Sequence, residues 1–303
     1  MIGIPDLPIC LKSESPAQFA RFQRFLDTHS EQALSWGGVE IPFCVCGRGD
    51  RTILTFAGGW GGIEMLYETI LGFEEHNRIV IVDISPFDDP AEMSHGVDSV
   101  LDEARVDRVV LMGQSLSGIL AQLYFRHRVG RVEALVLTNT LAPNRKRNRW
   151  WGRVLFACLP FPLVRVLLRP KIRRLEHFDR QLSPEVEERR RFARELLVTT
   201  MERVFTRERI ARILKLCWCF NELGEYSEHE LRDWAGRALL VTSEDDPYHS
   251  DAKILESALP GAKQHCLPIG FRHVAPQICL QEYQSAIQTF LDTLEGQDGR
   301  RTR

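Results

Sequence analysis

The sequence predicts an α/β fold, in which a mostly parallel, doubly wound sheet carries an inserted helical cap. Short runs rich in valine and isoleucine alternate with helical patterns over most of the 303 residues, as is typical of parallel sheets covered by helices. From about residue 141 to about residue 235 the pattern is almost entirely helical, which predicts the cap. Residues 113–118, Gly-Gln-Ser-Leu-Ser-Gly, follow an apolar run and predict a sharp turn from a strand into a helix.

The first part of the chain is expected to begin with a helix and then to alternate. Ser15-Pro16 predicts a helix that ends near His29, because proline is favoured in the first turn. Val39–Cys46 and Thr52–Phe56 predict a hairpin-like pair of strands around the glycine-containing segment between them. Further strands are expected at Arg78–Ile84 and Arg108–Met112, and helices at Gly62–Phe73 and Asp89–Ala104.

The alternation continues beyond residue 115. We expect a helix at Leu116–Arg128, followed by strands at Val132–Thr140, Ala238–Thr242 and Gln264–Leu267. A terminal helix is expected through Tyr283 to Leu291. Within the cap, residues 141–235, Ser183-Pro184 and Thr206 predict the starts of two helices.

The length suits one large domain with an insertion better than two independent domains. We assign residues 1–140 and 236–296 to the core, and residues 141–235 to a cap inserted after the strand that follows the helix at 116–128. Residues 297–303 are expected to form a flexible tail.

Composition and charge argue against several classes of protein. The formal net charge is −2, so there is no overall positive field to attract nucleic acid. The first residues lack the features of a signal peptide, and no run approaches about 20 apolar residues, so we expect a cytoplasmic protein. The eight cysteines are scattered, and Cys44/Cys46 and Cys217/Cys219 lack the usual zinc-site spacing. We interpret them as reduced core residues.

Ser115 is the candidate nucleophile. In the pattern Gly-x-Ser-x-Gly a strained turn projects the serine hydroxyl beyond the edge of the sheet. In this chain Ser117 takes the place of the second glycine, and glycine follows only at Gly118. The alternative interpretation is that Ser115 merely caps the helix that begins at Leu116.

A serine nucleophile needs a base, and a carboxylate that orients the base. The strand at 238–242 leads into the acidic turn 243–247, where we choose Asp246 because it directly precedes the turn proline. Asp245 and Glu244 are its competitors, the alternative is a solvated acidic turn, and Asp245→Asn is expected to have little effect. His273 lies in the loop between the last strand and the final helix. The order Ser115, Asp246, His273 therefore predicts a catalytic triad.

The strand at 52–56 ends in Ala57-Gly58-Gly59-Trp60-Gly61-Gly62, a glycine-rich exit that suits an oxyanion hole. We expect the amides of Gly59 and Leu116 to be its two donors. A phosphate-binding loop is rejected because the motif Gly-x-x-x-x-Gly-Lys-Ser/Thr is missing. The residues expected to line a substrate pocket are Gly58, Trp60, Gln114 and Trp218. For Trp218, packing in the core is the alternative.

With these motifs the chain resembles the α/β-hydrolase superfamily from Val39 to Leu294. The resemblance departs from the family pattern at Ala57, where a histidine is usual, and at Ser117. It implies hydrolysis through an acyl-enzyme, without a metal or an organic cofactor. The reactions it suggests are those of a carboxylesterase, thioesterase, lipase-like enzyme or lactonase, or cleavage of a carbon–carbon bond next to a ketone. A serine at the turn argues against dehalogenases and epoxide hydrolases, which use aspartate there.

Within the superfamily, the segments 115–122, 131–139 and 252–262 are similar to the maspardin branch, whose members are cytosolic. This resemblance implies a second hypothesis, a catalytically weak or inactive protein that binds a protein partner.

The start of the predicted cap is basic. Residues 144–174 contain ten lysines and arginines, no acid, and interspersed aromatic residues. Such a segment could contact an anionic membrane surface or bind an anionic substrate. The alternative is a solvated cap helix that pairs with the acids from Glu185 onward, and nucleic acid is the least favoured partner.

Overall fold

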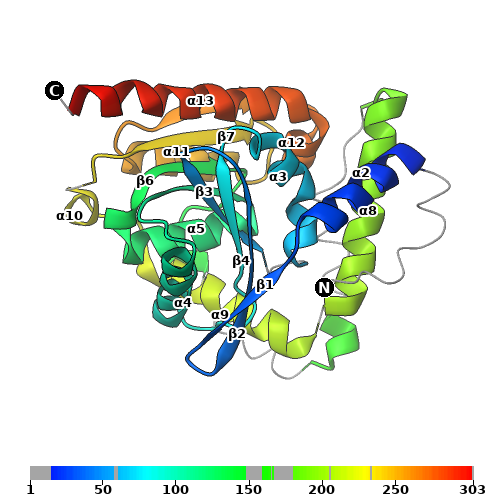
Figure 1. The fold of residues 1–303 in the computed structure, drawn as a ribbon, viewed down its shortest axis with the longest axis horizontal. Coiled ribbons are helices and arrows are strands. Elements are labelled where there is room, and N and C mark those ends of the chain that lie inside the picture. Colours follow the sequence, from blue (N-terminus) through cyan, green and yellow to red (C-terminus); the bar gives the residue numbers. More distant parts are fainter. Residues whose placement is uncertain are drawn as a thin grey trace.

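The computed structural model describes residues 15–57, 61–147, 159–164, 166, 180–204, 206–232 and 234–301 (Figure 1). These residues form one eight-stranded sheet in the order β1-β2-β4-β3-β5-β6-β7-β8. The strands are β1 (Gln32–Trp36), β2 (Val39–Gly47), β3 (Thr52–Ala57), β4 (Arg78–Asp83), β5 (Val109–Gln114), β6 (Val132–Thr138), β7 (Arg237–Ser243) and β8 (Lys263–Leu267). From β4 to β8 every neighbouring pair is parallel, whereas β1–β2 and β2–β4 are antiparallel. The predicted mostly parallel sheet is confirmed.

The predicted pairing of Val39–Cys46 with Thr52–Phe56 is wrong. β2 instead forms a hairpin with β1 around Gly37 and Gly38, whose φ values of +56° and +83° suit a tight hairpin turn. The other edge of β2 pairs with β4, and β3 lies between β4 and β5. The segment after Gly47 therefore passes over the position of β4, which lies between β2 and β3 in the sheet.

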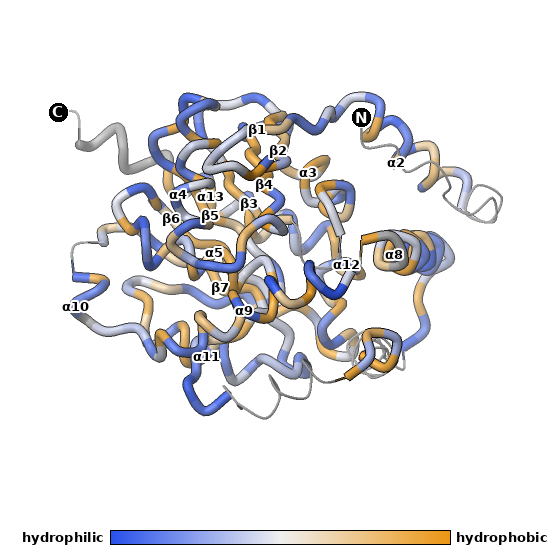
Figure 2. The backbone as a smooth tube through the Cα atoms, turned by 90° about the horizontal axis from the view of Figure 1, so that it is seen from below, coloured by the Kyte–Doolittle hydropathy of each residue, from blue (hydrophilic) through white to orange (hydrophobic). Residues whose placement is uncertain are grey.

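Helices cover both faces of the sheet because successive strand residues point to opposite sides. Leu54 and Phe56 pack into the core beneath α4 (Pro90–Glu103), α5 (Leu116–His127) and α11 (His249–Ala258). Ile53 packs into the opposite core, beneath α2 (Pro16–Thr28), α3 (Tyr67–Phe73) and α13 (Leu280–Arg301). Figure 2 shows hydrophobic residues along the inner strands and hydrophilic residues on the outer loops.

The interval between β6 and β7 contains the helices α8 (Pro184–Val204), α9 (Arg207–Leu223) and α10 (Glu228–Leu231). The helix starts predicted at Ser183-Pro184 and Thr206 are confirmed, and the Thr206 side chain accepts a hydrogen bond from the amide of Arg209. Figures 1 and 2 show α8 beside α2 at one end of the molecule, where the rings of Phe22 and Phe192 lie 5.6 Å apart. Short elements complete the described chain: 3-10 helices at Ile63–Leu66, Val129–Arg131, Arg145–Arg147 and Arg272–Val274, and α12 (Ala275–Ile278).

One predicted chain end differs from the structure. α13 continues to Arg301, so residues 297–301 are helical where we expected a tail. Glutamine, aspartate and arginine tolerate a helix, and the one glycine among these residues, Gly299, costs only about 1 kcal/mol. Ser15 precedes α2, but its hydroxyl makes no capping hydrogen bond.

The described cysteines, six in number, are all free, as expected, but Cys266 is exposed and does not belong to the core. Among the described residues, we find no helix with both the length and the apolar character needed to cross a bilayer.

Candidate active site

Ser115 joins β5 to α5 in a strained backbone conformation. Its φ of 53° and ψ of −117° lie in a region that residues other than glycine rarely adopt. Two hydrogen bonds hold the turn in place. The amide of Ser115 donates to the carbonyl of Thr138 (2.9 Å), and the hydroxyl of Thr140 donates to the carbonyl of Ser115 (2.7 Å). The hydroxyl of Ser115 is thereby presented at the carboxyl end of the sheet, where α/β folds place their sites.

The glycines of this turn are required by close packing. A Cβ at Gly113 would lie 2.5 Å from the carbonyl oxygen of Ser117, and a Cβ at Gly118 would lie 2.6 Å from the Thr140 hydroxyl. Ser117 is accommodated because its hydroxyl lies against β3, 3.4 Å from the donating amide of Phe56. The second position of the turn that is too crowded for a Cβ atom is therefore 118 in this chain, one residue later than in the usual pattern.

The structure brings Ser115, Asp246 and His273 together from the ends of β5, β7 and the loop after β8. His273 Nε2 lies 2.9 Å from Ser115 Oγ, and His273 Nδ1 lies 2.7 Å from Asp246 Oδ2. A carboxylate accepts the proton of Nδ1, which leaves the lone pair of Nε2 facing the serine hydroxyl. These three residues therefore have the geometry in which a histidine can remove the proton of the hydroxyl.

The carboxylate of Asp246 is held in a single position. Its side chain is 0% exposed, and its other oxygen, Oδ1, accepts a hydrogen bond from the amide of Tyr248 at 2.6 Å. The ring of Tyr248 meets the ring of His273 edge to face, with centroids 5.3 Å apart. Both the carboxylate and the imidazole are thus fixed by the turn that follows β7.

Asp245 has a structural role that the sequence did not indicate. Its carboxylate accepts hydrogen bonds from the hydroxyl of Ser243 (2.6 Å) and from the amides of Gly270 (2.8 Å) and Arg272 (3.3 Å). Burial alone would raise the pKa of Asp245, but these hydrogen bonds hold that pKa below its ordinary value. Asp245 therefore ties the end of β7 to the loop that carries His273. Because of these contacts we expect a measurable effect of its loss, whereas the sequence alone predicted little effect.

Replacement of Asp245 by alanine is expected to lower the free energy of unfolding by about 1–3 kcal/mol, because three hydrogen bonds to one carboxylate are lost. The freed loop should misplace His273 and lower kcat/KM for an ester by about 10- to 100-fold. Urea unfolding and ester hydrolysis measure the two effects. Glu244→Ala is the matched control, since Glu244 is exposed and lies in the same turn.

The stabilising effect of Asp245 should be complete at pH 7 and disappear only below about pH 4, since its folded pKa is depressed.

The predicted oxyanion hole is described only in part. Gly58, Gly59 and Trp60 lie outside the described residues. The backbone N–H of Leu116 is the first of α5, and the first N–H groups of a helix have no hydrogen-bond acceptor within the helix. On the far side of the glycine-rich segment, the Gly61 carbonyl accepts a hydrogen bond from Arg209 of α9 (3.0 Å). Gly61 is therefore tied to α9.

A cavity of about 480 Å³ opens over Ser115 and His273. The side chains that line it from α8 and α9 are Leu197, Met201, Ile210, Ile213, Leu214 and Cys217. Of the residues expected to line a substrate pocket, Gln114 lines this cavity, whereas Trp218 is not among the lining residues. On α9 the lining side chains form one stripe, and Trp218 is turned about 90° away from its centre. A cavity of this size and character suits an apolar group of a small molecule.

Sequence reasoning missed two further residues of the site. The side chain of Asn139 donates a hydrogen bond to the carbonyl of His273 (3.2 Å), and Tyr248 contacts both His273 and Asp246 as described above. Asn139 directly follows β6, and polar residues at the carboxyl ends of parallel strands are candidates for a site. No sequence motif marks Tyr248, because a tyrosine two residues after an aspartate is not characteristic of any known site.

The basic segment 144–174 lies largely outside the described residues, so its predicted membrane contact stays a prediction. Two of its first arginines make contacts within the protein. Arg147 pairs with Asp251 of α11 (2.7 Å), a residue that is 2% exposed, and Arg145 donates to the carbonyl of Glu222 (3.0 Å). Arg147 therefore pairs with an aspartate of α11. The sequence had instead suggested the acids of the cap helices, from Glu185 onward, as partners of the basic segment.

Comparison with known proteins yields partial similarities in sequence. The chain matches no protein-family model. It is 29% identical to maspardin of Rattus norvegicus over 112 residues, which are 36% of this chain and 43% of maspardin. It is 31% identical to human maspardin (Homo sapiens) over 94 residues, 30% of each chain. The matched region therefore spans less than half of the length of these relatives.

Similarity in structure covers most of the chain. The enol-lactonase of Burkholderia xenovorans LB400 aligns with a TM-score of 0.66 and 15% identity over 86% of this chain and 100% of the lactonase. A thermophilic esterase from Thermogutta terrifontis aligns with a TM-score of 0.61 and 15% identity over 88% of this chain and 98% of the esterase. At such identities the similarity establishes a shared fold.

Proposed function

We propose that this protein, which has the α/β-hydrolase fold, is a serine hydrolase that cleaves an ester or thioester through an acyl-enzyme. One observation carries the proposal. A continuous chain of hydrogen bonds runs from Asp246 through His273 to Ser115, over 2.7 Å and 2.9 Å, and ends at the floor of an apolar cavity. The fold is shared with hydrolases, and the resemblance to maspardin makes an inactive binding protein the second hypothesis.

In the acylation step, Ser115 Oγ attacks the carbonyl carbon of the substrate while His273 Nε2 takes the hydroxyl proton. Asp246 stabilises the resulting imidazolium and keeps the ring in place. The carbonyl oxygen becomes negatively charged, and we assign its stabilisation to the amides of Leu116 and Gly59. His273 then gives its proton to the leaving oxygen or sulfur. The leaving group departs and the acyl group stays on Ser115.

The deacylation step repeats this chemistry with water. His273 takes a proton from a water molecule, whose oxygen attacks the acyl carbon. The tetrahedral intermediate collapses, and the proton passes from His273 back to Ser115 Oγ. The products are a carboxylic acid and the regenerated enzyme, and the cycle needs no further reactant.

The cavity suggests that the acyl group of the substrate is apolar. Apolar side chains of α8 and α9 line it, and the polar residues that line it include Ser115, Gln114 and His273. An alkyl or aryl acyl group would bury its surface there, at about 0.8 kcal/mol for each CH₂ group. Lactone hydrolysis and carbon–carbon cleavage use the same first intermediate, and the lactonase named above shares the fold.

Labelling with a fluorophosphonate probe tests the proposal. We expect one covalent adduct, which peptide mapping by mass spectrometry should locate on Ser115. Ser117→Ala is the matched control and should label at a similar rate, because Ser117 faces β3. An adduct on Ser117, or labelling that survives Ser115→Ala, would disprove the assigned nucleophile.

The second hypothesis gives a different result in the same experiment. A hydrolase-fold protein that only binds a partner should show no labelling above a heat-denatured sample and no turnover of short-chain esters. The intact chain of hydrogen bonds favours the enzyme, because a binding protein has no need of a histidine poised between a serine and a buried carboxylate. A cytoplasmic location and contact with an anionic membrane stay predictions from the sequence.

A further inference from the structure

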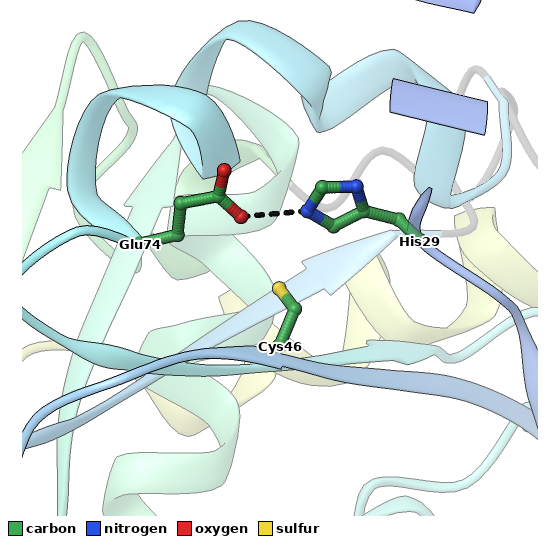
Figure 3. A group of neighbouring side chains, drawn as sticks. All are labelled: His29, Cys46 and Glu74. Atoms are coloured by element: carbon green, nitrogen blue, oxygen red, sulfur yellow. Dashed lines mark hydrogen bonds and ion pairs between the residues drawn. The ribbon is translucent and has the colours of Figure 1, made fainter. Parts of the chain in front are cut away.

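Three side chains of metal-ligating types meet at the edge of the sheet where β2 pairs with β4 (Figure 3). They are His29, just after α2, Cys46 on β2 and Glu74 at the end of α3. One potential ligand atom of each lies within 4.8 Å of the others. His29 Nε2 lies 2.6 Å from a carboxylate oxygen of Glu74, and the sulfur of Cys46 faces this pair. None of the three takes part in the proposed hydrolysis.

The contacts of His29 determine which nitrogen is available to a ligand. Nδ1 lies 3.0 Å from the carbonyl oxygen of Phe25 and 2.9 Å from the hydroxyl of Thr28. That hydroxyl donates its own proton to the carbonyl of Arg24 (2.7 Å), so towards His29 it can only accept. These acceptors favour the tautomer with the proton on Nδ1, and Nε2 is the nitrogen that faces Glu74. A backbone carbonyl bound to the opposite nitrogen is the usual support of a metal-bound histidine.

His29 Nε2 and a carboxylate oxygen of Glu74 lie 2.6 Å apart, so a cation held between or beside them would contact both atoms. The sulfur of Cys46 faces the same point and supplies a third ligand atom. The addition of a sulfur to this pair favours a metal ion, because a thiolate is a strong ligand for zinc.

We propose that His29, Cys46 and Glu74 bind a zinc ion, with water in the fourth position. Imidazole, thiolate and carboxylate are the ligands that zinc prefers, whereas magnesium and calcium prefer oxygen alone. In tetrahedral zinc sites, ligand atoms lie about 3.3–3.6 Å apart, as follows from metal–ligand bonds of about 2.0–2.3 Å. Binding would thus replace the short contact between His29 and Glu74 by two bonds to the metal.

The surroundings allow this adjustment while holding the ligands together. The side chain of Glu74 is 26% exposed and can shift by the small distance required, and the opening to solvent gives the ion a path. The backbone is much less free. The amide of Arg48 donates to the carbonyl of Glu74 (3.0 Å), and a Cβ at Gly47 would lie 2.2 Å from the carbonyl oxygen of Asn77. β2 and the end of α3 are thus locked side by side.

A metal at this site would fasten α2 to the sheet. The ring of Phe25 stacks on that of His29 with centroids 4.4 Å apart, and Phe22 of the same helix contacts Phe192 of α8. Zinc should therefore stabilise α2 and, through it, the packing of α8.

Titration of the full-length, chelator-treated protein with cobalt(II), which reports on zinc sites, tests the proposal. We expect a near-ultraviolet charge-transfer band from a cobalt–thiolate bond, which zinc then removes by competition. Cys46→Ser should lose the band, and Cys266→Ser, which alters an exposed cysteine, should keep it. Loss of a contact that only supports a metal ligand weakens metal binding by about 10- to 100-fold. His29→Ala removes a ligand itself and should weaken zinc binding by more than this.

Thermal unfolding supplies a second measurement. Zinc in excess should raise the melting temperature of the wild type and leave that of Cys46→Ser unchanged. The proposal is overturned if the wild type shows no band and no shift, or if the band survives Cys46→Ser. A lower unfolding temperature of the variants does not affect this test, because a folded wild type that binds neither metal is decisive. Fluorophosphonate labelling of Ser115 is independent of either outcome.

Discussion

Replacement of Ser115 by alanine is expected to abolish fluorophosphonate labelling and to lower kcat for a p-nitrophenyl ester by about 10⁶-fold. The size follows from serine proteases, in which loss of the nucleophile alone removes almost the whole contribution of the triad. The physical reason is that His273 then has no hydroxyl to deprotonate, although it keeps its hydrogen bond to Asp246. Initial-rate kinetics with an active-site titration of the wild type measure the loss.

Two controls make this result specific. Ser117→Ala alters the next hydroxyl along α5 and should retain most of the activity, because that side chain contacts β3. The Ser115→Ala protein should also unfold at a urea concentration equal to or above that of the wild type. A variant with one per cent or more of wild-type kcat, after contamination has been excluded, would contradict the proposed acyl-enzyme.

Asp246→Asn is expected to lower kcat by about 10⁴-fold while the protein stays folded. An asparagine that donates its amide N–H to Nδ1 favours the wrong tautomer of His273, in which Nε2 carries the proton and cannot accept one from Ser115. The amide of Tyr248 can still donate to the carbonyl oxygen of the new side chain, so the turn should persist. Rates of ester hydrolysis give the loss, and circular dichroism gives the state of the fold.

The comparison with the neighbouring carboxylate separates the two roles. Asp245→Ala should reduce stability and affect kcat/KM less, whereas Asp246→Asn should affect kcat by orders of magnitude with little change in stability. Equal losses of activity at the two positions would mean that Asp246 acts only by shaping the turn. Loss of activity confined to Asp245 would move the acid by one residue, against the 2.7 Å contact between Asp246 and His273.

Features that depend on neighbouring residues were predictable from the sequence. The helix at Pro16–Thr28, the helix start at Thr206 and the strand–serine–helix segment around Ser115 each follow from local preferences for caps, turns and apolar periodicity. The order of Ser115, Asp246 and His273 was also predictable, because parallel strands end at one edge of a sheet and polar residues that follow them meet there.

Features that depend on which strands and helices become neighbours were not predictable. Val39–Cys46 and Thr52–Phe56 read as a hairpin, but the sheet inserts β3 between β4 and β5 and gives β2 another partner. Trp218 was chosen by residue type, and the direction in which α9 turns its side chains removed it from the cavity.

The class of fold followed from the alternation of strand and helix patterns along the chain, and the turn at Ser115 followed from a motif of a few residues. The contacts of Asp245 with the loop of His273, and the proximity of His29, Cys46 and Glu74, became apparent only in the folded chain. These contacts join residues that are 17 to 45 positions apart. No local spacing marks them, because they arise from the packing of separate elements against the sheet.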